Sequence, residues 1–204
     1  MMSSVIDKKN IFSQPLPDSM FLELGCGDHK KNPAALGVDQ LDFSCVDLVG
    51  DVFDVLEKFP DQCIDGISSF HFVEHVGDLS KLIHAFDRVL KRGGILEITV
   101  PHFSNPYFYS DPTHKNHFGL YTFCYFTTQH PFSRTVPTYG MDRALNIVSV
   151  DLIFKSPKPF YVRYAFKKSL GWIFNSSNFM REFWEENLCY IFPCYELTYK
   201  IQAV

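Results

Sequence analysis

Two glycines and two aspartates are the first residues of this 204-residue chain whose types and spacing indicate chemistry. Gly25 and Gly27 end an apolar run, where glycine lets the backbone approach a ligand closely. Asp39 ends the next apolar run, and its two carboxylate oxygens match the two donors of a ribose diol. Asp51 ends a further run and can accept a hydrogen bond from an adenine amino group. Together they predict a nucleoside site, although a tight turn and two helix caps would use the same residue types.

The spacing of these residues argues against a dinucleotide. A dinucleotide fingerprint has a third glycine three residues after Gly27, where this chain has Lys30. Its acidic residue lies about 20 residues further on, whereas Asp39 comes sooner. We therefore expect a nucleoside that carries an uncharged or zwitterionic tail rather than phosphates.

Three histidines and an aspartate form a second candidate group. His102, Asp111 and His114 lie in one connection after an expected strand, and His75 follows an earlier strand. Histidine is the usual side chain for moving a proton near neutral pH, so these groups are candidates to bind or deprotonate a second substrate. Two alternatives remain: a turn that begins at Asp111 and is capped by His114, and a structural hydrogen bond from His75.

A metal site is the less favoured interpretation of the residues after the fourth strand. His71, Glu74 and His75 are spaced i, i+3 and i+4, so on a helix they would share one face. Hard divalent cations prefer oxygen ligands, and here only Glu74 supplies one. The sequence therefore predicts no metal site.

The elements that must position these residues alternate in the first half of the chain. Apolar runs predict strands at residues 20–24, 36–39, 46–49, 64–70 and 95–100, with later strands at 146–154 and 195–201. Residues 79–90 have apolar side chains at helical spacing, and Asp78 and Gly93 stand at cap positions. A strand, a helix and a strand in succession indicate a mostly parallel sheet flanked by helices, an α/β fold.

The pattern changes after the fifth strand. Residues 101–140 contain five prolines among aromatic and histidine residues, which predicts an ordered, aromatic-rich insertion within a single domain of residues 1–204. Residues 1–18 are expected to be an N-terminal extension. The aromatic side chains can stack on a sugar ring or pack as the core of a lid; they are Tyr107, Phe108, Tyr109, Phe118, Tyr121, Phe123, Tyr125 and Phe126.

Charge distribution limits the possible partners. Nineteen basic and 23 acidic side chains give a formal net charge of −4, which argues against a dedicated nucleic-acid binder. Residues 155–168 interleave basic and aromatic side chains, so they can receive an acidic sugar nucleotide, a lipid-linked phosphate or an anionic membrane surface. A solvated basic edge is the alternative. The sequence does not predict the oligomeric state.

The composition is that of a folded protein in a reducing compartment. Hydrophobic residues make up 46% and charged residues 21%, which excludes disorder and collagen-like sequence as the main theme. The six cysteines form no CxxC pair, so neither a zinc ribbon nor a redox dithiol is expected. We find neither an apolar run of about 20 residues nor a signal-like start, and we expect a cytoplasmic protein without a transmembrane segment.

The motifs of the first half resemble the class I S-adenosylmethionine-dependent methyltransferases, specifically the group called methyltransferase type 11. The matching motifs are LELGCG at 22–27, GVD at 37–39, GD at 50–51, IDGISSFHFVEHV at 64–76 and LKRGGILEITVP at 90–101. They cover residues 20–101 in the order in which the family has them. The resemblance implies a Rossmann-like methyltransferase fold with S-adenosylmethionine as its cofactor.

The resemblance also implies which residues contact that cofactor. The methionine part would lie against Glu23, Gly25, Cys26 and Gly27, the ribose against Asp39, the adenine against Asp51 and Val52, and the sulfonium beside Phe70 and His71. Residues 28–35 depart from the family, which usually has a helix there. They include Pro33, and we expect a loop or a single turn.

The acceptor is predicted from a second resemblance. PHFSN at 101–105, DPTH at 111–114 and HF at 117–118 resemble a stretch of bacterial members encoded with surface-polysaccharide biosynthesis. The expected reaction is O-methylation of a sugar or another small acceptor, such as a sugar nucleotide or a lipid-linked sugar. His102, Asp111 and His114 would bind the acceptor or take its proton, supported by His75. The alternatives are an RNA-modifying methyltransferase and a non-catalytic cofactor-binding relative that acts as a partner subunit.

Overall fold

One mixed sheet of eight strands organises the chain. The computed structural model describes residues 5–137, 145–156 and 158–204. The strands run in the order β1-β4-β3-β2-β5-β6-β8-β7. Their bounds are Ile6–Asp7 (β1), Phe21–Leu24 (β2), Leu36–Asp39 (β3), Leu48–Val49 (β4), Ile64–Phe70 (β5), Leu90–Pro101 (β6), Leu145–Ile153 (β7) and Glu196–Ala203 (β8).

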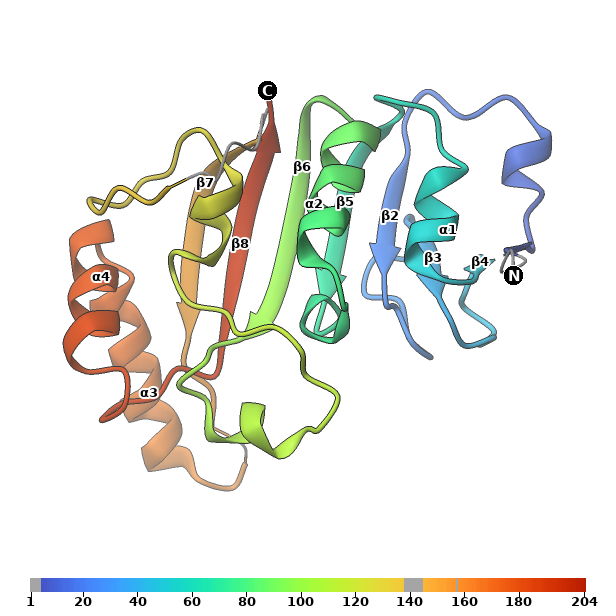
Figure 1. Ribbon diagram of the computed structural model, residues 1–204. Helices are drawn as coiled ribbons and strands as arrows, with labels where there is room; N and C mark the ends of the chain where they lie inside the picture. The colour runs from blue at the N-terminus through green and yellow to red at the C-terminus, as the bar shows by residue number, and fades with distance from the viewer. Residues whose placement is uncertain (1–4, 138–144, 157) are drawn as a thin grey trace.

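The five central strands are parallel, as the alternating pattern predicts. β2 pairs with β3 and β5, β3 with β4, and β5 with β6, all in parallel. β8 is antiparallel to both β6 and β7, and β1 is antiparallel to β4. The prediction of a mostly parallel sheet is confirmed. All five central strands end at one edge, which is the lower edge in Figure 1.

Helices flank the sheet in two groups. Their bounds are Val52–Glu57 (α1), Leu79–Val89 (α2), Tyr161–Phe174 (α3) and Asn178–Asn187 (α4). Figure 1 shows α1 and α2 together over the central strands, and α3 and α4 beside β7 at one end of the sheet. α2 is the helix that the periodicity predicts; its cap is Asp78, whose carboxylate accepts from the backbone N–H of Lys81 at 2.8 Å. The sequence patterns had not indicated α1 or α4 as helices.

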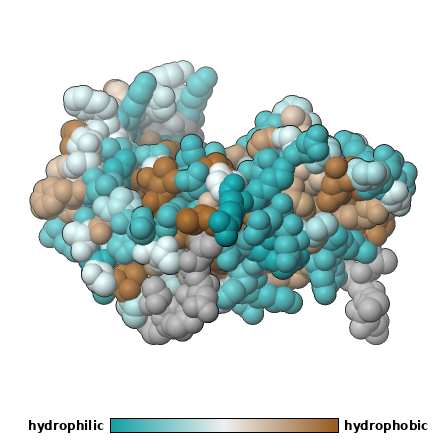
Figure 2. Space-filling model, turned by 90° about the horizontal axis from the view of Figure 1, so that it is seen from above, coloured by the Kyte–Doolittle hydropathy of each residue, from teal (hydrophilic) through white to brown (hydrophobic). Residues whose placement is uncertain are grey.

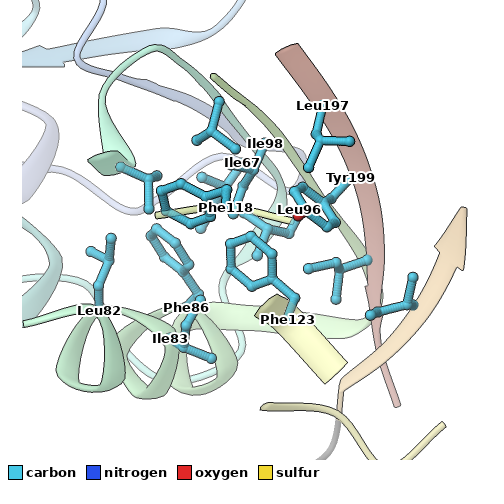
Figure 3. Close-up of a cluster of buried hydrophobic side chains, with 14 of the residues drawn as sticks. Ile67, Leu82, Ile83, Phe86, Leu96, Ile98, Phe118, Phe123, Leu197 and Tyr199 are labelled. Carbon is cyan, nitrogen blue, oxygen red and sulfur yellow. The ribbon is translucent and has the colours of Figure 1, made fainter. Parts of the chain in front are cut away.

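Residues 102–137, which follow β6, have little regular structure and pack into the main core. They contain short 3-10 helices at Pro106–Ser110 (η3) and Thr122–Phe126 (η4). Phe118 and Phe123 from this segment are fully buried, and Phe123 meets Tyr199 of β8 with ring centroids 4.6 Å apart (Figure 3). In contrast, Tyr107 and Tyr109 are exposed. The aromatic residues therefore divide between core packing and the surface.

The amino-terminal residues complete the far edge of the sheet. β1 pairs with β4, and the ring of Phe12, in the 3-10 helix Ile11–Ser13 (η1), meets Phe59 with centroids 5.0 Å apart. Figure 2, which views the molecule from above Figure 1, shows hydrophilic residues over most of that face with separate hydrophobic patches. In the part of the chain that the structure describes, no helix combines the length and the apolar character needed to cross a membrane.

A buried aspartate secures the loop beneath the glycine turn. Asp47 is 6% exposed and accepts from the amino group of Lys30 at 2.7 Å, from the backbone N–H of Gly37 at 2.8 Å and from the amino group of Lys9 at 2.9 Å. Burial acts to raise the pKa of Asp47, but these hydrogen bonds outweigh it, so the pKa lies below its ordinary value.

We expect Asp47→Asn to lower the free energy of unfolding at pH 7 by about 2 kcal/mol, because a charged hydrogen-bonded group is lost from a buried position. A depressed native pKa stabilises the fold above the unfolded pKa of about 3.9 and loses that contribution as the pH falls through the native value. The difference between wild type and variant in urea titrations should therefore shrink below about pH 4. Asp42→Asn, at an exposed carboxylate that pairs with Lys8, is the matched control and should show little change. A constant difference at every pH would contradict this account.

Candidate functional site

The glycine turn after β2 lies at the carboxyl edge of the sheet. Gly25 and Gly27 have φ values of 64° and 58°, in the left-handed region that favours glycine. The N–H of Gly25 donates to the carbonyl of Val38 at 2.8 Å, which ties the turn to β3. A Cβ at Gly25 would lie 2.5 Å from Phe72, whereas one at Gly27 would meet none of the described atoms within 4 Å. Gly25 is thus needed for packing, and Gly27 faces open space.

The two predicted nucleoside carboxylates stand at the ends of neighbouring strands and also organise the backbone. Asp39 accepts from the N–H groups of Gly27 and Leu41, each at 2.9 Å. Asp51 caps α1 by accepting from the N–H of Phe53 at 2.9 Å. Every carboxylate oxygen has a second lone pair, so both groups keep capacity for a ligand. The structure therefore shows the capping interactions, and ligand binding by the two carboxylates stays a prediction. Val52 follows Asp51 and is buried in the first turn of α1.

Glu23 acts through the loop that follows the turn. Its carboxylate is 2% exposed and accepts from the backbone N–H groups of Lys31 at 2.8 Å and Asn32 at 2.7 Å. Residues 28–35 form turns and bends, as Pro33 predicts. The hydrogen bonds from Glu23 therefore hold this loop, which has no helix. Cys26 is also buried, and that burial raises the pKa of its thiol to about 12, which keeps the thiol neutral.

Lys31 is a site residue that the motifs do not reveal. Its amino group lies 3.6 Å from the ring centroid of Phe70, a cation–π contact at the end of β5. Burial lowers the pKa of Lys31, opposed by the nearby carboxylate of Glu196. The side chain thus places a positive charge among the predicted cofactor residues. The neighbouring Lys30 does not contribute a charge in the same way, because its amino group donates to Asp47.

His71 links the predicted cofactor residues to β8. Its backbone φ angle is 54°, in the left-handed region that residues other than glycine rarely adopt. Its Nε2 lies 2.9 Å from Glu196 and its Nδ1 lies 3.4 Å from Glu74, both buried carboxylates. Those two interactions, with Glu196 the larger, raise the pKa of His71 to about 9. Glu196 also pairs with Lys155, so charged groups directly after β5, on β8 and shortly after β7 meet here.

His75, Asp111 and His114, three of the four residues predicted to serve the acceptor, lie together. The Thr113 hydroxyl donates to Asp111 at 2.6 Å and lies 2.8 Å from Nδ1 of His75. Nδ1 of His114 lies 2.8 Å from the carbonyl oxygen of Phe108. The two imidazole rings have centroids 4.9 Å apart. The motif spacing placed Asp111 and His114 in this segment but did not single out Thr113, which connects Asp111 to His75.

His102 is separated from this group. It is fully buried; Nδ1 accepts from the N–H of Ser104 at 3.0 Å, and Nε2 lies 3.1 Å from the carboxylate of Glu185 on α4. Its ring also packs against Trp184, with centroids 5.0 Å apart. With both ring nitrogens engaged and no exposed surface, His102 joins the segment after β6 to α4. Its proximity in sequence to His114 gave no indication of this burial.

The comparisons with known proteins concern the family and the fold of the chain. A family model described as a methyltransferase domain matches residues 4–142, more than half of the chain. No curated protein matches the sequence. The solved structures that resemble the chain are less than 20% identical to it in sequence, so they show a shared fold.

Three solved structures illustrate the likeness. A SAM-dependent methyltransferase from Archaeoglobus fulgidus has a TM-score of 0.56 at 18% identity and covers 90% of this chain and 86% of its own. Phosphoethanolamine N-methyltransferase 2 from Haemonchus contortus, in complex with S-adenosyl-L-methionine, has a TM-score of 0.55 at 15% identity over 96% of this chain. This chain spans 51% of the length of that protein. Geranyl diphosphate C-methyltransferase from Streptomyces coelicolor A3(2) has a TM-score of 0.51 at 14% identity, over 97% of this chain and 78% of its own.

We expect His102→Ala to lower the free energy of unfolding by about 3 kcal/mol, because it removes a buried ring and leaves Glu185 without one of its partners. The binding of an adenosine ligand at the glycine turn should change less than about twofold at temperatures where the variant is folded. Urea titration and calorimetry with adenosine-containing ligands would measure the two effects separately. A variant as stable as wild type would show that the buried contacts of His102 contribute little.

Proposed function

Since the chain belongs to the methyltransferase-domain family, we propose that it transfers a methyl group from S-adenosylmethionine to a small acceptor. The observation that carries this proposal is the turn at Gly27, which faces open space at the carboxyl edge beside the carboxylates of Asp39 and Asp51. That edge is where open α/β sheets bind ligands. The Haemonchus protein, which shares the fold, is in complex with this donor, and this supports the same donor here.

The residues at this edge fit the parts of such a donor. Asp39 offers its free lone pairs to the ribose, and Asp51 with Val52 borders the adenine. Glu23 holds the loop that carries Lys31, whose ammonium group would neutralise the carboxylate of the methionine part. Gly25, Cys26 and Gly27 would line the path of that part, with Phe70 and His71 beside the sulfonium. The donor thus matches a nucleoside site with a zwitterionic tail.

Methyl transfer places a modest demand on the protein. The bond between the donor's sulfur and the methyl carbon breaks while a bond from the acceptor oxygen to that carbon forms, and the acceptor loses its hydroxyl proton. Catalysis therefore consists mainly of holding the two reactants in line and drawing off that proton. We assign the acceptor hydroxyl to the group formed by His75, Asp111 and His114, in the segment between β6 and β7. His102 supports this segment from within the core.

A basic cavity next to the site favours an acceptor with an anionic group. The cavity has a volume of about 290 Å³, and its lining includes Tyr107, Lys155, Arg163 and Lys167. Lys155 pairs with Glu196, but no carboxylate of the described residues forms an ion pair with Arg163 or Lys167. Unpaired cations around a cavity are suited to phosphate. With the resemblance to polysaccharide-cluster proteins, this supports O-methylation of a sugar carried on a nucleotide or a lipid phosphate.

The donor site can be tested by comparing two glycine substitutions. Gly27→Ala and Gly93→Ala both place a side chain at positive φ, and a Cβ at either position meets no described atom within 4 Å. Each should therefore cost about 1 kcal/mol of stability. Only Gly27→Ala puts a methyl group where the donor is expected, so it alone should weaken S-adenosylhomocysteine binding by more than roughly tenfold in calorimetry. Wild-type protein that releases no heat with S-adenosylhomocysteine or S-adenosylmethionine would disprove the proposed function.

The acceptor class can be tested with an anionic probe. We expect uridine diphosphate to bind the wild-type protein, and Arg163→Ala or Lys167→Ala to weaken that binding by about tenfold each, because each removes a charge-assisted hydrogen bond. Lys168→Ala, on the same helix but outside the cavity, is the control and should change little. Equal losses at all three positions would indicate general charge attraction rather than a site in this cavity.

A further inference from the structure

We propose that Glu74, His75 and His114 bind a divalent transition-metal ion that activates the acceptor. The ion's part in catalysis rests on the function proposed above, whereas its binding can be tested independently. One ligand atom from each residue lies within 4.8 Å of the others. Ligand atoms about 2 Å from a tetrahedral ion lie about 3.3 Å apart, so small side-chain rotations would close the site.

Glu74 supplies an independent indication of a missing partner. The side chain is 1% exposed, and one carboxylate oxygen lies 3.4 Å from Nδ1 of His71. The other oxygen, Oε2, is buried and has no hydrogen-bond partner among the described residues. A buried carboxylate oxygen without a partner is costly, and native proteins satisfy such atoms with water, a ligand or an ion. A cation beside Oε2 would remove this cost.

The hydrogen bonds of both histidines occupy Nδ1 and leave Nε2 as the available ligand atom. A carbonyl oxygen only accepts, so Nδ1 of His114 carries the proton it donates to Phe108, and in the neutral ring Nε2 keeps its lone pair. Nε2 lies 3.7 Å from Oδ2 of Asp111, which is beyond hydrogen-bond distance. The Thr113 hydroxyl donates its proton to Asp111, so it accepts from Nδ1 of His75, again leaving Nε2 with a lone pair. Metal-bound histidines are held in this way, with the second nitrogen donating to a carbonyl, a hydroxyl or a carboxylate relay. Asp111 and Thr113 are thus positioning residues.

The donor set selects the type of ion. Two imidazole nitrogens and one carboxylate suit Zn²⁺, Mn²⁺, Fe²⁺ or Co²⁺ better than Mg²⁺ or Ca²⁺, which prefer oxygen ligands. The sequence grouped His71 with Glu74 and His75, and it predicted no metal site because only Glu74 supplies an oxygen ligand for a hard cation. In the structure His71 is engaged by Glu196, and His114 takes its place from 39 residues beyond His75 in the chain.

The ion would perform the step that the proposed reaction requires. His75 and His114 are only partly buried, which leaves the site open to the acceptor. An acceptor hydroxyl bound to the cation would lose its proton to water at a lower pH than in solution. The resulting oxygen anion would attack the methyl carbon as the bond from carbon to sulfur breaks, and the cation would remain on the protein. No redox change is involved.

Cobalt binding by the full-length protein tests the site directly. After chelator treatment and dialysis, we expect one Co²⁺ per chain, followed by its visible absorption, with competition by Zn²⁺ but not by Mg²⁺. Glu74→Gln and His114→Gln remove ligands and should weaken Co²⁺ binding by roughly 100-fold, and Thr113→Val should weaken it by about tenfold, because it only orients His75. His84→Gln, an exposed histidine on α2, is the control and should bind as wild type does.

Two further measurements separate the possible outcomes. Thermal melting shows whether each variant is folded, and Thr113→Val keeps the proposal testable where a ligand variant does not fold. Binding of S-adenosylhomocysteine is measured on the same samples without metal. Protein that binds this nucleoside but no Co²⁺, or that binds Co²⁺ equally well with Glu74→Gln and His114→Gln, overturns the metal site and leaves the proposed function intact. Protein that binds Co²⁺ but not the nucleoside overturns the proposed function instead.

Discussion

The candidate site for the methyl acceptor depends on hydrogen bonds to the backbone carbonyl of Glu74. This carbonyl receives the N–H groups of Lys115 at 2.8 Å and Asn116 at 3.2 Å, and the Asn116 side chain donates to the carbonyl of Val76 at 2.6 Å. These bonds fasten the segment after β6 to the 3-10 helix Val73–His75 (η2) at the end of β5. His75 follows Glu74 in the chain and His114 precedes Lys115, so these backbone hydrogen bonds bring His75 and His114 together. Without them, the residues of the site would belong to two unrelated loops.

The residues that follow Asn116 in the same segment are anchored in the core rather than at the surface. Phe118 and Phe123 are fully buried, and the carboxylate of Glu185 accepts from the N–H of Leu120 at 2.7 Å while bonding His102. A loop that carries both a hydrophobic anchor and a buried charged hydrogen bond has little freedom to open. Residues 102–126 are therefore better described as a fixed wall of the candidate site than as a mobile lid, and the exposed Tyr107 among them lines the basic cavity.

Sequence reasoning succeeded where a feature depends on neighbouring residues and failed where it depends on distant ones. The periodicity of residues 79–90 predicts α2, and the apolar runs that end before Gly25 and at Asp39 predict β2 and β3, because each is a local pattern. The burial of His102 is decided by α4, more than 70 residues away, and the state of His71 is decided by Glu196 on β8. α4 has apolar side chains at helical spacing, Phe179, Met180, Phe183 and Trp184, but Phe179 and Phe183 are exposed.

The charges around Glu74 show how a cation can coexist with a sulfonium donor at this edge. His71 lies between Glu196 at 2.9 Å and Glu74 at 3.4 Å, so its stronger partner is the carboxylate on β8. Glu74 thus keeps one oxygen that no described residue uses, on a side chain whose backbone holds the second segment in place. Glu196 in turn balances both His71 and Lys155. The two buried carboxylates thus have different partners. Glu196 neutralises the positive charges of His71 and Lys155, and the free oxygen of Glu74 is available to the proposed metal cation.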